Sequence, residues 1–547
     1  MDHALSRYAV LHLVLVSTIL CVGLGILVSP SWHFALIVLA PLSFIGVHDL
    51  LQKSHAILRN YPVIGHMRFL LESIRPELRQ YLIEDERDPV PFSREQRALV
   101  YRRAKNAPDK QAFGSVANFQ GPGYGWIDHS IRPIELPYHD FRVTVGGPDC
   151  RQPYEASILN ISGTSFGAVS AHAVMALNKG AKLGGFAHNT GEGSISPYHR
   201  RHGGDIIWQI ATGYFGCRTA EGRFDGDLFA KQAADPQVKM IEIKLSQGAK
   251  PGHGGVLPKE KITAEIAETR GVAMGVDCVS PGAHPEFSNP REFCAFVARL
   301  RDLSGGKPIG MKLAIGHHHE FLALVKAMLA TGVAPDFIVI DGGEGGTGAA
   351  PMELTDHVGA PLVEGLSFVH NALIGANLRR QIKLGASGKI ISAYDMVRAF
   401  ALGADFIMSA RGFMFSIGCI QSRSCHSNHC PTGVATQDKS RQAALVVDDK
   451  APRVASFHRN TLRALAEVLG AAGVTHPQDL MPWHLHIRHQ SGKVLRGDEV
   501  YPSVQPGSLL NSTVDAALAQ EWDQAQVDTF APTRVTRPHR AVTLTKA

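Results

Sequence analysis

The chain has 547 residues, 45% of them hydrophobic and 19% charged, so it is long enough to bury a large core. Its formal net charge of +6 is mild for this length, and the basic residues are scattered rather than gathered into a stripe with interleaved aromatic residues, which excludes a nucleic-acid-binding surface. Eight cysteines in so long a chain do not make a disulfide framework, and three of them crowd between residues 419 and 430. Reduced thiols and a metal centre are therefore expected.

The amino-terminal region contains two apolar runs. Residues 9–28 carry no formal charge and are about as long as a helix that crosses a bilayer core. A shorter run at 33–47 follows a turn and contains Pro41. Basic residues flank the pair on both outer sides, so we expect a transmembrane hairpin that anchors a cytoplasmic catalytic domain to a bacterial inner membrane. A cleaved signal peptide, whose apolar core would be shorter, and two buried core helices are the alternatives.

Four regions are expected from the way composition changes along the chain. Residues 50–110 combine Arg and Glu with spaced apolar residues, as in an amphipathic helix that lies along a membrane or along a barrel. The end of the chain is of mixed helical character and closes in a basic tail. The expected divisions are a transmembrane hairpin at 1–50, an amphipathic helical linker at 51–150, a catalytic barrel at 151–450 and a helical extension at 451–547.

The catalytic region alternates short β-branched or apolar runs with helix-like segments, as a parallel sheet requires. Eight such units predict a (β/α)₈ TIM barrel in the α/β class, with Gly, Lys, His and Glu residues gathered just after the strands at the carboxyl face. A doubly wound open sheet is the alternative, but no G-x-G-x-x-G opens a helix after the first strand. The predicted strands lie at 156–162, 183–189, 239–245, 276–280, 308–314, 336–342, 381–387 and 405–411.

A loop late in the chain carries the sharpest local signal. Cys419, Cys425 and Cys430 are spaced C-x5-C-x4-C, with Pro431 after the last. Three thiolates in one loop can hold three irons of a cubane, and a cysteine followed by proline recurs in iron–sulfur loops. A zinc site with a neighbouring histidine as fourth ligand, and a loop without metal, stay open at this point.

Glycine-rich loops follow several of the predicted strands. GASGKI at 385–390 and SARGF at 409–413 offer backbone amides for a phosphate, at the usual phosphate position of such barrels. Glycines that only shape tight turns are the alternative. The loops at 244–255 and 342–351 let backbone approach a flat cofactor closely, and Gln247, Lys250 and Lys312 can bind a flavin edge or an anionic substrate.

A run of three histidines at 316–320 invites a metal assignment. Consecutive side chains point in different directions, so we expect a solvated loop rather than a ligand set.

Together these residues resemble the FMN-binding synthase domain of glutamate synthase. The resemblance covers 157–438, about half of the chain. The cysteine loop with CPTGVATQ and the segment KLSQGAKPG are highly specific. The other matching segments are SGTSFGAVS at 162–170, NTGEG at 189–193, GEGGTGAAP at 343–351 and the two phosphate loops.

The resemblance implies an oxidoreductase with FMN on the carboxyl face and a [3Fe-4S] cluster on Cys419, Cys425 and Cys430. The implied reaction reduces an imine of 2-oxoglutarate to glutamate or to an N-substituted glutamate. The residues expected in catalysis are Lys312, Gln247, Lys250 and His253. The residues expected to bind the cofactor are Ser165, Gly167, Glu192, Gln247, Lys312, Gly345, Gly346, Gly388, Lys389, Arg411 and Gly412.

Three departures from the family pattern change what is expected of partners. The glutaminase region and the closing β-helix are missing, so ammonia is expected from a separate subunit. His253 stands where the family has a glutamate, and Thr164 and Glu344 replace methionine and aspartate. An electron donor protein or a quinol is expected to supply the electrons. A membrane electron-transfer or sensor flavoprotein without synthase turnover is the second hypothesis, and an inosine-phosphate-type dehydrogenase ranks last.

Overall fold

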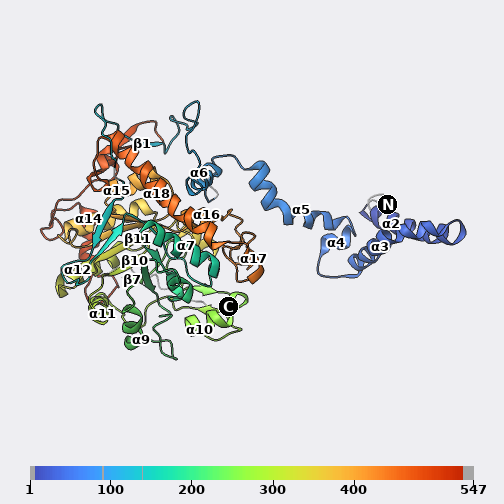
Figure 1. Cartoon of the computed structure of the whole chain (residues 1–547), viewed down its shortest axis with the longest axis horizontal. Coiled ribbons are helices and arrows are strands. Elements are labelled where there is room, and N and C mark those ends of the chain that lie inside the picture. The colour runs from blue at the N-terminus through green and yellow to red at the C-terminus, as the bar shows by residue number, and fades with distance from the viewer. Residues whose placement is uncertain (1–6, 89–90, 138, 534–547) are drawn as a thin grey trace, which may run out of the picture. The chain divides into compact units, whose positions relative to one another are not determined.

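A computed structural model describes residues 7–88, 91–137 and 139–533 (Figure 1). The chain divides into two compact units, Met1–Asp88 and Pro89–Ala547. The first unit is helical, and the second contains the barrel.

Two apolar helices of the first unit, Ala9–Leu27 and Pro30–Leu51, are long and apolar enough to cross a membrane. They form a hairpin in which the Thr18 and Ser43 hydroxyl oxygens lie 2.8 Å apart. At its end, the buried carboxylate of Asp49 accepts hydrogen bonds from Val63 N and His66 Nε2 at 3.0 and 2.9 Å. The helices of this unit are α2 (Ala9–Leu27), η1 (Pro30–Ala35), α3 (Leu36–Leu51), α4 (Ala56–Asn60), α5 (Gly65–Leu78) and the π-helical turn η2 (Arg79–Ile83).

Eight parallel strands close into a barrel in the second unit, which confirms the predicted (β/α)₈ fold. Each strand pairs with its neighbours in sequence, and β13 pairs with β4 to close the ring. The strands are β4 (Leu159–Ile161), β5 (His188–Asn189), β6 (Ile206–Ile210), β7 (Val238–Lys244), β10 (Ile309–Leu313), β11 (Phe337–Asp341), β12 (Lys383–Ser387) and β13 (Phe406–Ser409).

One predicted barrel strand is wrong and one barrel strand was missed. Residues 276–280 contribute only the short strand β9 (Cys278–Val279), which pairs with β8 (Val256–Leu257) antiparallel and outside the barrel. The missing barrel strand is β6, whose five residues are all buried. Because both of its faces are covered, it lacks the alternation that reveals a half-exposed strand.

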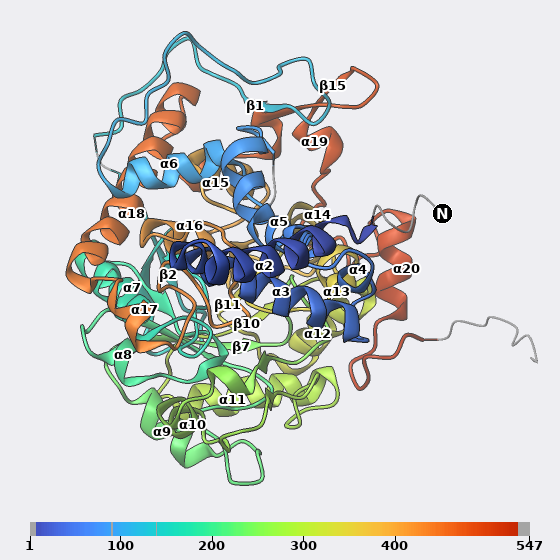
Figure 2. The same cartoon turned by 90° about the vertical axis from the view of Figure 1, so that its right-hand side faces the viewer.

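Helices surround the strands and cover the outside of the barrel (Figure 2). Helix α7 shows why they begin and end where they do: Ser170 Oγ accepts a hydrogen bond from Ala173 N, and Gly185 ends the helix with φ of 67°. The larger helices are α7 (Ala171–Gly184), α9 (Gly226–Ala233), α11 (Pro290–Leu303), α12 (His318–Thr331), α14 (Leu362–Gly375), α15 (Ala393–Ala401) and α18 (Val447–Ala472).

Shorter elements decorate the barrel. The short helices are α6 (Arg94–Ala104), α8 (Pro197–Arg200), α10 (Ala264–Arg270), α13 (Met352–His357), α16 (Arg411–Ser416), α17 (Lys439–Ala443), α19 (Gly497–Val500) and α20 (Ala516–Gln524), with 3₁₀ turns η3 (Gly191–Gly193), η4 (Lys259–Lys261), η5 (Pro477–Asp479) and η6 (Pro482–His484). The remaining strands form a sheet of β1 (Gly125–Ile127), β14 (Leu485–Arg488) and β15 (Val494–Arg496) and a hairpin of β2 (Arg142–Val145) and β3 (Tyr154–Ser157).

The sequence predicted that the histidine run is a solvated loop, but part of the run is helical. Helix α12 begins within it, with His317 as the residue before the first turn. His318 stacks on Phe368 with ring centroids 4.0 Å apart.

The outward face of β6 gives a test of the barrel packing. Trp208 is fully buried and stacks on Phe229 of α9, with ring centroids 5.1 Å apart. Trp208→Ala should lower the free energy of unfolding by about 3–5 kcal/mol, because it leaves a large cavity between strand and helix. Leu228→Ala, at an exposed position of the same helix, should change it by less than about 0.5 kcal/mol. Urea unfolding of both variants in detergent, followed by circular dichroism, measures the difference, and equal effects would contradict this packing.

Candidate functional site

The carboxyl ends of the barrel strands bring together lysines and carboxylates. Lys244 on β7 and Lys312 on β10 are register partners on neighbouring strands. Lys312 Nζ lies 3.3 Å from Asp341 Oδ2 at the end of β11, and Lys244 Nζ lies 2.9 Å from Glu192 Oε2 in the loop after β5. Two ion pairs therefore line the mouth of the barrel.

A third carboxylate lies below this mouth in the barrel interior. Glu242 is fully buried and accepts hydrogen bonds from Asn189 Nδ2 at 2.9 Å and Gln209 Nε2 at 2.5 Å. Its other oxygen, Oε2, has no hydrogen-bond partner within the described part of the chain. An acceptor of this kind adds negative charge beneath the lysines.

The pKa shifts follow from these pairs. Burial alone would lower the pKa of Lys312, but the carboxylates of Asp341 and Glu242 outweigh burial and raise it. Burial alone would raise the pKa of Glu192, but Lys244, with Arg270 and Lys250, lowers it to about 2. Both Lys312 and Glu192 are therefore charged at neutral pH.

The loop after β7 carries three of the predicted catalytic residues. In the structure they differ from one another in burial and in the groups that they contact. Gln247 Oε1 accepts a short hydrogen bond from Lys244 Nζ, so its carboxamide belongs to the cluster at the mouth. Lys250 is 4% exposed, and burial lowers the pKa of its ammonium, with Glu192 opposing. His253 is exposed and its Nδ1 lies 2.8 Å from the carbonyl oxygen of Gly254, away from these charges.

Two glycine-rich loops meet without room for side chains. A Cβ at Gly248 would lie 1.7 Å from the carbonyl oxygen of Gly342, and the amide of Gly248 donates to Asp341 Oδ2 at 3.1 Å. Glycine at this position lets the loop after β7 reach the carboxylate that also holds Lys312. The glycine spacing noted in the sequence thus joins two loops of the site.

The loops after β12 and β13 lie side by side because these strands are paired. Gly388 and Lys389 have φ of 147° and 50°, so this turn presents backbone in a conformation that favours glycine. Burial lowers the pKa of Lys389, and the nearby guanidinium of Arg411 lowers it further. Burial lowers the pKa of Arg411 to about 10, against Asp341 and Glu344. Two partly buried cations that destabilise each other suit a bound anion such as the phosphate of FMN.

The remaining predicted cofactor residues frame the same mouth. Arg411 Nη2 donates to the carbonyl oxygen of Glu344 at 3.1 Å, and the Glu344 carboxylate accepts from Leu362 N at the start of α14. A Cβ at Gly346 would lie 2.9 Å from Arg411 Cζ, one at Gly345 would lie 3.2 Å from Asp341 Oδ1, and one at Gly412 would lie 2.8 Å from Ser409 Oγ.

The loop after β4 faces the loop after β5. A Cβ at Gly191 would lie 2.9 Å from Ser165 N. Gly167 has φ of 102°, and a Cβ there would lie 3.2 Å from Arg270 Nη2. Ser165, Gly167 and Glu192 are thus gathered in one place, with Arg270 beside them.

The three cysteines of the late loop are free thiols that interact electrostatically. Burial, together with the neighbouring Cys425 and Cys430, raises the pKa of Cys419 to about 12. Burial would also raise the pKa of Cys430, but hydrogen bonds from neighbouring backbone, Ala435 first among them, lower it. Among the described residues, no group of three or more His, Cys, Asp or Glu side chains is arranged to hold a metal ion.

Lys261, which sequence reasoning missed, ties the cysteine loop to the barrel. It is 3% exposed, and its Nζ donates to the carbonyl oxygens of Ala168, Cys425 and Ala435 at 2.9, 3.2 and 3.4 Å. Burial lowers the pKa of Lys261 to about 8, against the neighbouring cysteines.

A segment that precedes the barrel holds the other side of the cysteine loop. Tyr101 of α6 donates to the carbonyl oxygen of Cys419 at 2.7 Å, and Gln421 bonds the backbone of Phe92 in both directions, at 2.9 and 3.1 Å. The Arg411 guanidinium lies 4.7 Å from the centroid of the Phe92 ring. The cysteine loop and the phosphate loops therefore share one support.

Besides Lys261, three site residues escaped the sequence reasoning, namely Lys244, Asp341 and Arg270. Lys244 and Asp341 end strands that had been located, so their position was a usable signal. Lys261 and Arg270 lie just before the segment that was taken for a barrel strand, and that error concealed them.

Lys261 gives a test of how the cysteine loop is held. Lys261→Met removes a donor shared by three carbonyls, so Cys425 and Cys430 in cluster-free protein should react with a thiol reagent roughly tenfold faster. Lys259→Met, at an exposed position of the same turn, is the matched control and should leave the rate unchanged. Mass spectrometry assigns the labelled cysteines, and equal rates in the two variants would show that Lys261 does not hold the loop.

Comparison with known proteins locates this site within a family. Residues 150–475 match the family model described as a conserved region in glutamate synthase. The chain is 38% identical over 518 residues to the glutamate synthase large subunit-like protein YerD of Bacillus subtilis, covering 87% of this chain and 97% of that protein.

Other matches are more distant. An archaeal-type glutamate synthase [NADPH] of Thermotoga sp. is 33% identical over 311 residues, and the match spans 57% of this chain and 58% of that protein. Among solved structures, a mutant flavocytochrome b2 with pyruvate bound aligns with a TM-score of 0.41 at 13% identity, over 82% of this chain and 91% of that one.

Proposed function

Because the chain belongs to the glutamate synthase family, we propose that it uses FMN and a [3Fe-4S] cluster to reduce an imine of 2-oxoglutarate to glutamate or to an N-substituted glutamate. Membership of this family makes the chain a glutamate synthase-type oxidoreductase. The observation that carries the proposal is the array of buried cations at the barrel mouth, Lys312, Lys250, Lys389 and Arg411.

FMN fits the loops at this mouth. Lys389 and Arg411 would hold its phosphate, with backbone of Gly388 and Gly412 close by, because two cations that repel each other are stabilised by a dianion. FMN supplies hydride chemistry when bound, and an iron–sulfur cluster supplies single electrons.

A dicarboxylate-derived imine suits the lysines. Lys312 is held charged by Asp341 and would bind a substrate carboxylate, while Gln247 and Lys244 would orient the other end. Reduction of the imine adds a hydride to carbon and a proton to nitrogen. Lys250, whose pKa is lowered by burial, is a stronger acid than a free lysine and would give up that proton from Nζ. His253 lies exposed near the rim, where it would meet a partner or substrate group arriving from solvent.

The supply of substrates and electrons is assigned to partners. We propose that a separate subunit provides ammonia and that an electron donor protein or a quinol reduces the cluster. The apolar hairpin would anchor the protein in the inner membrane of a bacterium, with the catalytic unit in the cytoplasm.

Anaerobic purification in detergent tests the cofactors. We expect released FMN and the low-temperature EPR signal of an oxidised three-iron cluster. FMN without that signal would overturn the cluster assignment, and protein without either cofactor would overturn the proposal as a whole.

Turnover separates an enzyme from a membrane electron-transfer or sensor flavoprotein. Adding 2-oxoglutarate and ammonia to reduced protein should reoxidise the flavin. Lys312→Met should slow this reoxidation at least roughly hundredfold, because the buried ammonium group that would bind the substrate carboxylate is lost. Lys383→Met, at the opposite end of the barrel, is the control and should keep the wild-type rate. No reoxidation in wild-type protein would favour the sensor.

A further inference from the structure

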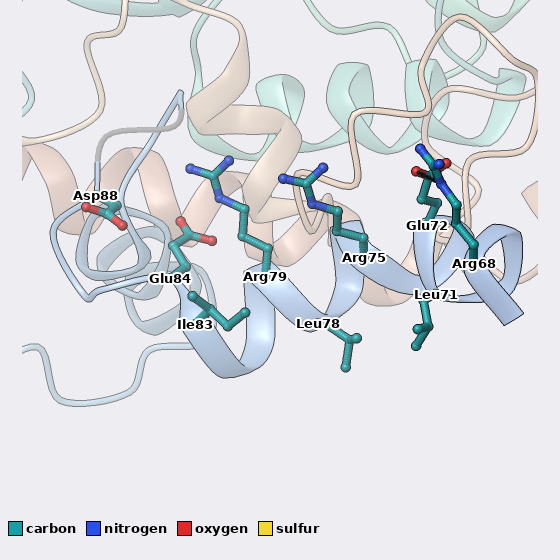
Figure 3. Close-up of a pocket in the computed structure, with 9 residues that line it drawn as sticks. All are labelled: Arg68, Leu71, Glu72, Arg75, Leu78, Arg79, Ile83, Glu84 and Asp88. Carbon is teal, nitrogen blue, oxygen red and sulfur yellow. Dashed lines mark hydrogen bonds and ion pairs between the residues drawn. The ribbon is translucent and has the colours of Figure 1, made fainter. Parts of the chain in front are cut away.

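The segment that follows the hairpin has two distinct faces. Arg68, Glu72, Arg75 and Arg79 recur at helical spacing along α5 and the start of η2. Figure 3 shows the three arginine side chains pointing to one side of the ribbon and Leu71 and Leu78 pointing away from them. A groove of about 660 Å³ runs between these faces.

Much of the apolar face lies open. Leu70, Leu71 and Met67 are 56%, 52% and 53% exposed, and Leu82 and Ile83 of η2 are 77% and 76% exposed. Several large apolar side chains exposed along one short segment mark a site that contacts another apolar phase.

The start of α5 is tied to the end of the membrane hairpin. The Asp49 carboxylate, near the last residue of the apolar helix α3, bonds both Val63 N and His66 Nε2. Val63 lies two residues before the start of the helix, and His66 lies in its first turn. If α3 reaches the bilayer surface at its last residues, α5 begins at that surface.

The charges of the groove suit a phosphodiester. Arg68 pairs with Glu72 at 3.2 Å, but Arg75 and Arg79 make no ion pair within the described part of the chain. Glu84 and Asp88 lie past Arg79 at the far end of the groove, and the Asp88 carboxylate accepts a bond from Asp85 N at 3.3 Å. The middle of the groove therefore presents two uncompensated guanidinium groups.

We propose that α5 and η2 form a lipid-binding surface, which lies in the membrane interface and holds the headgroup phosphates of anionic phospholipids on Arg75 and Arg79. The leucines enter the acyl boundary, while the arginines reach the headgroup level along their methylene stems. This inference rests on the proposed membrane anchor and is separate from the proposed reaction.

Hydrogen exchange of the full chain in lipid nanodiscs tests the proposal. Residues 65–83 should exchange more slowly in nanodiscs that contain phosphatidylglycerol than in pure phosphatidylcholine, by roughly fivefold for each unpaired arginine. The triple variant Arg68→Gln, Arg75→Gln, Arg79→Gln should lose this difference. The matched control, Arg201→Gln, Arg380→Gln, Arg463→Gln on exposed positions of the barrel unit, should keep it.

The other outcomes are distinct. Equal exchange of residues 65–83 in both kinds of nanodisc would overturn the lipid site. The lipid site would also be overturned if these residues were protected as strongly in phospholipid-free detergent as in nanodiscs, because protein would then cover the apolar face. Protection by inorganic phosphate alone would identify a free anion as the ligand instead. A chain that does not enter nanodiscs at all would refute the membrane anchor and, with it, the lipid site that rests on the anchor, while the proposed reaction would stand.

Discussion

The candidate site depends on pairing Lys244 and Lys312, which lie on neighbouring strands, with carboxylates at the barrel mouth. Side chains alternate along a strand, so register decides which residues face inward, and the Lys244–Lys312 register places two ammonium groups side by side. Left alone they would repel each other in a desolvated space. Glu192 follows β5, Asp341 ends β11 and Glu242 lies on β7 itself; Asp341 and Glu242 raise the pKa of Lys312, and Glu192 pairs with Lys244. A charged mouth is thus a property of the closed barrel, since an open sheet would not surround the lysines.

A backbone contact links the charged residues at the barrel mouth to the loops around it. Asp341 accepts from Lys312 and from the amide of Gly248, so one carboxylate fixes both a side chain and a loop. The clash that a Cβ at Gly248 would make shows that the loop after β7 reaches this carboxylate only through glycine. A substitution there would alter the position of Gln247 and Lys250 without touching either residue.

Much of the fold could be predicted from the sequence, because most barrel strands are short β-branched or apolar runs that alternate with helical segments. Strand β6 could not, since burial on both faces removes its alternation and Gln209 breaks its apolar run. The polarity of Gln209 follows from the pairing of β6 with β7, where its register partner is Glu242 and its amide donates to that carboxylate. The candidate site residues also divide into those that a local pattern predicts and those that it does not. Local motifs predicted Lys312, Lys389 and the cysteines. Lys261 and Arg270 bond residues of other loops, which no local pattern connects to them.

The cysteine loop shows how residues outside the family region shape a family motif. The match begins at residue 150, yet Phe92 and Tyr101 hold the loop through Gln421 and the Cys419 carbonyl. Phe92 also lies beneath Arg411, so the same few residues contact both the cysteine loop and the phosphate loops. The segment at 91–104, which precedes the family region but belongs to the barrel unit, is therefore part of the framework of the candidate site, and a truncation that removed it would remove contacts to both sets of loops.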